Sequence, residues 1–180
     1  MKKISTKQII YVALFVALAA VMSQIFVPVP GGVPFTLQPW AINLAGLILG
    51  PKLGALSALI YITLGALGAP VFTPGPLGFI RIIGPWGGFL LMHPVMAYLS
   101  GFGAKKHIGL AVFFTGLGVF IGLTGGAVQF MLVNNITLGA AFAVAFIPFI
   151  PEAIMRTIIT PVFAKIINSA LAKSGVAIQD

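Results

Sequence analysis

The sequence predicts an all-α membrane protein, a single domain over residues 1–180 in which six transmembrane helices form a bundle with long outer loops. Two observations predict this class. Apolar residues make up 59% of the 180 residues, and charged residues only 7%, where a soluble domain has roughly 25%. Ten basic and two acidic residues cannot cover the surface of a soluble domain, which excludes a soluble enzyme, a nucleic-acid-binding domain and a disordered tail. The length suits about six spans of ~20 residues with their loops.

Breaks in the apolar runs define the predicted helices. The first run is too long for a signal peptide and is read as a retained helix. Gly50-Pro51 divides the second apolar region into two short helices, because proline ends a helix. Asn134-Asn135 marks a turn, and Pro151 suits the first position of a helix. The predicted spans cover residues about 8–27, 35–50, 53–68, 86–103, 108–133 and 151–171, with a short outer helix at about 138–149.

The lysines indicate the orientation of this topology. With six spans, every lysine falls on the side that holds both termini: Lys2, Lys3, Lys7, Lys52, Lys105, Lys106, Lys165 and Lys173. The loops on the other side, around 28–38, 69–85 and 134–150, contain no lysine. Because positive charge accumulates on the cytoplasmic side of a membrane, we expect a multi-pass protein of the cell membrane with both termini in the cytoplasm. The net charge of +8 therefore requires no nucleic-acid partner.

Three charges remain in the outer half: Arg81, Glu152 and Arg156. Ionisable groups at membrane depth are costly and usually face a cavity, a partner or a transport path. Glu152 and Arg156 are four residues apart on one helix face, so one interpretation is a structural ion pair. The other is that at least one arginine faces an anionic ligand, since the guanidinium fork matches a carboxylate; Arg156 is the first candidate, and Arg81 would act likewise if it replaces a cation of the loop. Two arginines against one acid leave a spare positive charge, which favours an anion.

Polar and aromatic residues flank the two long Pro/Gly-rich loops. They are Thr36, Gln38, Asn43, Thr73 and Trp86. Trp86 has two readings: an aromatic of the membrane interface or a wall that stacks on a ligand. His93 has no second ligand-type residue nearby, so a hydrogen-bonded packing role is favoured over a metal site. No nucleophile–base pair, Walker loop or metal cluster is recognisable, so we expect neither an enzyme nor a cofactor in this chain, and transport energy would come from an ion gradient or a partner.

Small residues at four-residue spacing predict close helix contacts. Gly46 and Gly50, and then Gly118, Gly122 and Gly126, suit internal packing. Ala13 and Ala17 form a stripe on the first predicted span. If that stripe is exposed, it would dock another membrane protein.

Several motifs follow one another in the order seen in a known family. They are Val33-Pro34-Phe35-Thr36-Leu37-Gln38, Leu49-Gly50-Pro51-Lys52-Leu53-Gly54, Gly65-Ala66-Leu67-Gly68-Ala69-Pro70-Val71-Phe72, Gly84-Pro85-Trp86-Gly87-Gly88-Phe89 and Phe146-Ile147-Pro148-Phe149-Ile150-Pro151. In this order and spacing the chain resembles the BioY family, the biotin-specific substrate-binding (S) components of energy-coupling factor (ECF) transporters.

The resemblance implies six helices, a ligand pocket near the outer face and no catalysis. It implies three kinds of partner: the surrounding lipid bilayer, a T component embedded in that bilayer, and two cytoplasmic ATPase subunits, which use the ATP. Ala13 and Ala17 resemble the surface of S components that meets the T component. The substrate-binding residues expected here are Gln38, Arg81, Trp86, Phe89, Glu152 and Arg156.

The expected pocket departs from the family pattern. Trp86 stands at a Thr/Ser position, Phe89 at a Tyr position and Leu90 at a position that is often Arg. In the last helix, Arg156 keeps the cation, whereas Ala153 replaces the usual acid and an acid stands at Glu152. The chain is therefore expected to capture biotin or a biotin-like carboxylate, with two alternatives: an S component for a more apolar acid such as lipoate, or a structural or assembly membrane protein without a ligand.

Overall fold

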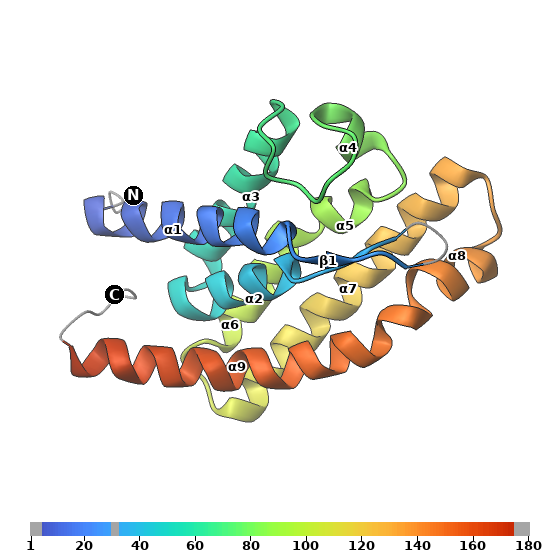
Figure 1. Ribbon diagram of the computed structural model, residues 1–180. Coiled ribbons are helices and arrows are strands. Elements are labelled where there is room, and N and C mark those ends of the chain that lie inside the picture. The colour runs from blue at the N-terminus through green and yellow to red at the C-terminus, as the bar shows by residue number, and fades with distance from the viewer. Residues whose placement is uncertain (1–4, 30–32, 175–180) are drawn as a thin grey trace.

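The fold is a bundle of helices closed at one end by loops (Figure 1). A computed structural model describes residues 5–29 and 33–174. The helices are α1 (Thr6–Ser23), α2 (Gln38–Leu49), α3 (Pro51–Ala66), α4 (Phe79–Ile83), α5 (Gly87–Leu91), α6 (His93–Gly103), α7 (Ile108–Asn134), α8 (Leu138–Ala145) and α9 (Ile150–Lys173), with a 3-10 helix η1 (Ile147–Phe149) and a short antiparallel pair of strands, β1 (Phe26–Val27) and β2 (Phe35–Thr36). This architecture confirms the predicted all-α class.

Several helices are suited to a membrane. Among the described residues, three segments are long and apolar enough to cross one: α1, α7 and the stretch Leu138–Lys173 that runs from α8 through α9. The shorter α3 is also apolar. Their outward faces carry many exposed large apolar side chains, which is the arrangement expected for a surface that contacts lipid.

Two predicted helix boundaries at the first loop are wrong. The span predicted over 8–27 ends as a helix at Ser23, and residues 26–27 form β1. The span predicted over 35–50 begins as a helix only at Gln38, because residues 35–36 form β2 and pair with β1. Proline disfavours the helical conformation of the residue before it. Val27 precedes Pro28, and so the chain continues there as extended backbone.

Two other predicted helices are interrupted. The span predicted over 86–103 is divided at Met92 into α5 and α6. The outer helix predicted over 138–149 ends at Ala145 and continues as η1. In each case a proline, Pro94 or Pro148, lies just after the break. Since proline lacks the N–H that would bond to the preceding turn, it favours a break at these two positions, although α9 continues through Pro161.

The glycine pairs mediate helix packing, as the spacing predicts. A Cβ atom at Gly46 would collide with the backbone of Ala97, so α2 and α6 approach with no side chain between them. Gly118 places α7 against the backbone of Met96 of α6, and Gly122 leaves room for the Met96 side chain. These contacts bring the helices that carry the site residues into fixed positions.

The described lysines are exposed and lie away from the long loops. The start of α1, the α2–α3 turn and the end of α9 lie at one end of the bundle, on the left of Figure 1, while α8 lies at the opposite end. Lys105 and Lys106 line a groove together with Lys165 of α9. The predicted positions of Lys2 and Lys3, and the acid Asp180, lie outside the described residues.

Candidate functional site

A cavity lies between the long loops and the first turns of α9. Its wall contains all six residues that the sequence predicted as substrate-binding: Gln38, Arg81, Trp86, Phe89, Glu152 and Arg156. These residues come from α2, α4, α5 and α9 and from the residue that precedes α5. The fold thus brings together side chains that are up to 118 positions apart in the sequence (156 minus 38).

Hydrogen bonds from α1 and α3 hold the second long loop over the cavity. The hydroxyl groups of Ser23 and Tyr61 both donate to the carbonyl oxygen of Val71, at 2.6 and 2.8 Å. The Gln24 amide donates to the carbonyl of Phe72 at 3.0 Å. Buried polar groups of this kind are costly unless they are paired, so these bonds fix the position of the loop. Phe72, which lines the cavity, is held in place by them.

A single glutamine of α7 fixes the connection between α4 and α5. The Nε2 atom of Gln129 donates to the carbonyl oxygens of Ile82 and Gly84, at 2.7 and 2.8 Å. Arg81 precedes this anchored segment and Trp86 follows it, and the two side chains contact each other in the cavity wall. The Arg81 guanidinium carbon lies 4.2 Å from the ring centroid of Trp86, within the range of a cation–π contact.

Arg81 is a buried cation whose charge has no acidic partner in the described part of the chain. Its side chain is 6% exposed, and its Nη1 atom is buried without a hydrogen-bond partner. Burial lowers the pKa of this guanidinium from its ordinary value, yet arginine keeps its proton in proteins. Arg81 therefore brings a permanent positive charge and an unused donor to the cavity.

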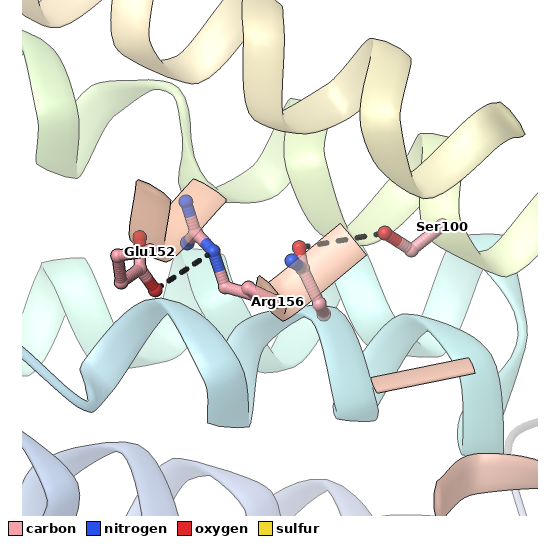
Figure 2. Close-up of polar contacts among 4 residues, drawn as sticks. Ser100, Glu152 and Arg156 are labelled. Atoms are coloured by element: carbon pink, nitrogen blue, oxygen red, sulfur yellow. Dashed lines mark hydrogen bonds and ion pairs between the residues drawn. The ribbon is translucent and has the colours of Figure 1, made fainter. Parts of the chain in front are cut away.

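Arg156 and Glu152 form the ion pair that their spacing predicts. Arg156 Nε lies 3.2 Å from Glu152 Oε1, and the two side chains are 3% and 22% exposed (Figure 2). The contact lacks hydrogen-bond geometry, so Nε and Nη1 of Arg156 and Oε1 of Glu152 remain without hydrogen-bond partners. The pair neutralises its own charge and still offers both donors and an acceptor to a ligand.

Aromatic rings form the apolar wall. The rings of Phe35 and Phe149 have centroids 4.4 Å apart, and Phe89 lies 6.1 Å from Phe149. Gly126 of α7 allows the Phe89 ring to pack directly on the helix backbone. The sequence pointed to Trp86 and Phe89 but missed Phe35 and Phe149, because an aromatic residue in an apolar chain carries no local signal of its position.

His93 has the hydrogen-bonded packing role that the sequence favoured. Its Nδ1 lies 3.2 Å from the Nε2 of Gln38, and both residues are buried in the cavity wall. The bond holds Gln38 at the start of α2. Within the described residues, no group of three potential metal ligands is found.

The helices also contain buried polar residues. Most of them carry little signal in the sequence. Ser100 of α6 donates to Asn43 of α2 at 3.4 Å. Thr115 of α7 and Thr160 of α9 are buried with hydroxyl oxygens that have no hydrogen-bond partner. One signal was available: Thr160 follows Arg156 by four residues, so both lie on one face of α9.

The comparisons with known proteins agree with this geometry. The model of the BioY family matches residues 1–173. A biotin transporter BioY from Thermotoga maritima is 33% identical over 162 residues, which cover 88% of this chain and 94% of that one. A probable biotin transporter BioY from Pyrococcus horikoshii is 51% identical over 100 residues, 56% of this chain and 61% of the relative.

A solved structure has the same fold. The crystal structure of the S-component for biotin from an ECF-type ABC transporter superposes with a TM-score of 0.82. The two proteins are 27% identical, and the match covers 91% of each chain. The likeness therefore extends over most of the length of both chains.

Proposed function

Because this chain belongs to the BioY family, we propose that it is the substrate-binding component of an ECF-type importer and that it captures biotin in the cavity between the loops and α9. The observation that carries this proposal is the charge of the cavity wall. Two buried arginines and one glutamate line the cavity together with aromatic rings. A net positive, largely apolar cavity suits a small amphipathic acid such as biotin, which joins an apolar bicyclic ring and alkyl chain to a carboxylate.

The biotin carboxylate binds at Arg81. Glu152 already balances Arg156, so a second carboxylate there would meet a like charge, which disfavours the ionised form of both. Arg81 has no such competitor among the described residues and retains a buried Nη1 without a partner. Its contact with Trp86 holds the guanidinium plane in place.

The uncharged ureido group of biotin binds at Glu152 and Arg156. A ureido group offers two N–H donors and one carbonyl acceptor. The unpaired Oε1 of Glu152 accepts from a ureido N–H, and the unpaired nitrogens of Arg156 donate to the ureido oxygen. Hydrogen bonds that involve an ionised group are roughly twice as strong as neutral ones, so this end of the cavity distinguishes biotin from acids that lack the ureido group.

The experiment that tests the ligand uses the purified protein. Mass spectrometry of the small molecules that co-purify should identify biotin, and titration should show one biotin per chain with lipoate binding at least about tenfold more weakly. Lipoate shares the carboxylate but has a dithiolane ring in place of the ureido ring. Tighter binding of lipoate would identify the more apolar acid, and not biotin, as the ligand. Binding of neither acid would support a ligand-free structural protein.

A paired variant tests the assigned position of the ureido group. Glu152→Gln combined with Arg156→Gln removes both charges without leaving one of them alone. We expect this variant to lower the affinity for biotin by about tenfold or more, because hydrogen bonds to charged groups contribute ~1.5–3 kcal/mol. The affinity for lipoate should stay nearly unchanged. Equal losses for the two acids would contradict the ureido assignment.

Partner proteins complete the proposed importer. The exposed Ala13 and Ala17 lie on the outward face of α1, where small residues allow another helix to approach closely. A membrane-embedded T component docks there, and two cytoplasmic ATPases supply the energy. The lysine-rich end faces the cytoplasm, in keeping with the distribution of positive charge in membrane proteins, and places both termini on that side.

A further inference from the structure

A second groove lies at the lysine-rich end of the bundle, away from the ligand cavity. It is formed by the end of α2, the α6–α7 turn, the start of α7 and the second half of α9, and its lining includes Leu47, Lys105, Lys106, Ala111, Lys165 and Asn168. Figure 1 shows the α6–α7 turn and α9 crossing at this end. The groove shares no lining residue with the outer cavity.

The rim of the groove is strongly cationic. Lys105 and Lys106 extend from the turn on one side, and Lys165 from α9 on the other. All three are exposed, and no acidic residue is among the described residues that line the groove. Helix α7 also begins here, at Ile108, with no acid in its first turn. The positive end of its dipole adds to the attraction for an anion.

The floor of the groove is apolar. Leu47, Ala111 and Ala164 are 2%, 6% and 2% exposed. The Asn168 amide donates to the carbonyl of Leu47 at 3.2 Å and so joins α9 to the end of α2 beneath the rim. A site for a small inorganic anion would need no apolar floor, whereas an amphiphile uses both parts.

We propose that this groove binds an anionic phospholipid of the inner leaflet, with the headgroup phosphate between Lys105, Lys106 and Lys165 and the start of the acyl chains against the apolar floor. Basic pockets between membrane helices on the cytoplasmic side are suited to such headgroups. The proposal uses the cytoplasmic orientation of the lysines and does not depend on the ligand of the outer cavity.

The test compares two variants with the same change in charge. The groove variant carries Lys105→Gln, Lys106→Gln and Lys165→Gln, and the control carries Lys7→Gln, Lys52→Gln and Lys173→Gln, all exposed lysines outside the groove. Native mass spectrometry measures retention of phosphatidylglycerol, with phosphatidylcholine as the neutral probe. We expect the groove variant to lose about tenfold or more of its phosphatidylglycerol affinity, and the control less than about threefold, since each lysine near an anionic surface contributes ~1 kcal/mol.

Several results would overturn the proposal. An equal loss in both variants would mean that the lysines attract lipid only through their summed charge. Displacement of the lipid by millimolar inorganic phosphate would identify a site for a free anion. Loss of co-purification with the T component or the ATPases, at unchanged lipid affinity, would identify a protein interface.

A folding control keeps the result interpretable. Both variants should bind biotin like the unmodified protein, because the groove and the outer cavity are lined by different residues. If the triple groove variant fails to fold, its three single substitutions carry the same comparison. Each should then lower phosphatidylglycerol affinity by about threefold to fivefold, and the absence of any loss would contradict the proposal.

Discussion

The two ends of the bundle use positive charge in opposite ways. At the end that holds the ligand cavity, Arg81 and Arg156 are 6% and 2% exposed, and aromatic side chains line the cavity around them. At the lysine-rich end, the six described lysines are exposed and lie at the starts of α1 and α3, on the α6–α7 turn and in the second half of α9. Composition alone treats these cations as one group, whereas their burial separates them into charges that need a partner and charges that are already solvated.

This difference has an energetic consequence. A buried charge loses its hydration, and the effective cost of this loss is several kcal/mol per ion. Only a partner charge or hydrogen bonds can compensate for it. An exposed lysine meets no such cost. The buried arginines are therefore expected to affect both folding and ligand binding, and the exposed lysines to affect mainly association with membranes and partners.

The largest effect on stability is expected at the buried ion pair. Arg156→Ala leaves Glu152 largely buried and unpaired, and breaking a buried pair costs ~3–5 kcal/mol. Because Glu152 is 22% exposed, we expect about 3 kcal/mol, measured as the loss in free energy of unfolding in detergent. The combined variant Glu152→Gln with Arg156→Gln should recover most of this loss. A stable Arg156→Ala variant would show that the pair contributes little to the fold.

Helix packing should give the next largest effect. A Cβ atom at Gly46 would collide with the backbone of Ala97, whereas a Cβ atom at Gly139 meets nothing within 4 Å. Gly46→Ala should therefore destabilise the protein by about 1–3 kcal/mol, and Gly139→Ala should be neutral or slightly stabilising. Thermal unfolding of both variants measures the difference, and similar melting temperatures would argue against a close α2–α6 contact.

The exposed stripe of α1 should affect association without affecting the fold. Ala13→Leu and Ala17→Leu add bulk on an exposed face, so stability and biotin binding should change little. Co-purification with the T component and biotin uptake should be lost, because small residues permit the close approach of helices. Ala140→Leu, at an exposed alanine of α8, is the matched control. A loss of biotin binding would instead place the stripe in internal packing.

The smallest effect on stability is expected at the lysine-rich end. Lys52→Gln removes one exposed charge and should change the free energy of unfolding by less than about 0.5 kcal/mol.

Cysteines introduced at Lys105 and at Pro76 should react with an impermeant reagent from opposite faces of intact cells. Labelling of both positions from outside would contradict the orientation assigned from the lysines.

Much of the site was predictable because its residues break the pattern of their surroundings. Arg81, Glu152 and Arg156 are charges in an apolar half of the chain, and their cost in a membrane identified them. Phe35 and Phe149 were not predictable in this way, because fifteen phenylalanines occur in the chain and only tertiary packing selects those that face the cavity. The helix boundaries near 26–36 were missed because the extended strands there depend on pairing with each other.

The sequence pointed first to Arg156 as the carboxylate site and kept Arg81 as a second candidate, whereas the structure favours Arg81. Their residue type is the same, and the spacing of Glu152 and Arg156 allowed either a closed pair or a ligand contact. The structure contains the pair at 3.2 Å and leaves Arg81 without an acidic partner among the described residues. That difference supports Arg81 for the carboxylate, which composition and spacing alone did not favour.

The most direct test of this account is a double-mutant cycle between Arg81 and the ligand carboxylate. Biotin and biotin amide are titrated into the unmodified protein, Arg81→Gln and the exposed-charge control Lys52→Gln. Truncating one partner of a buried charge pair costs ~2–5 kcal/mol, so Arg81→Gln should weaken biotin by at least about 30-fold and the amide by less than about threefold. Lys52→Gln should change neither. Unchanged biotin affinity in a folded Arg81→Gln variant, or equal losses for acid and amide, would contradict the assignment of the carboxylate to Arg81.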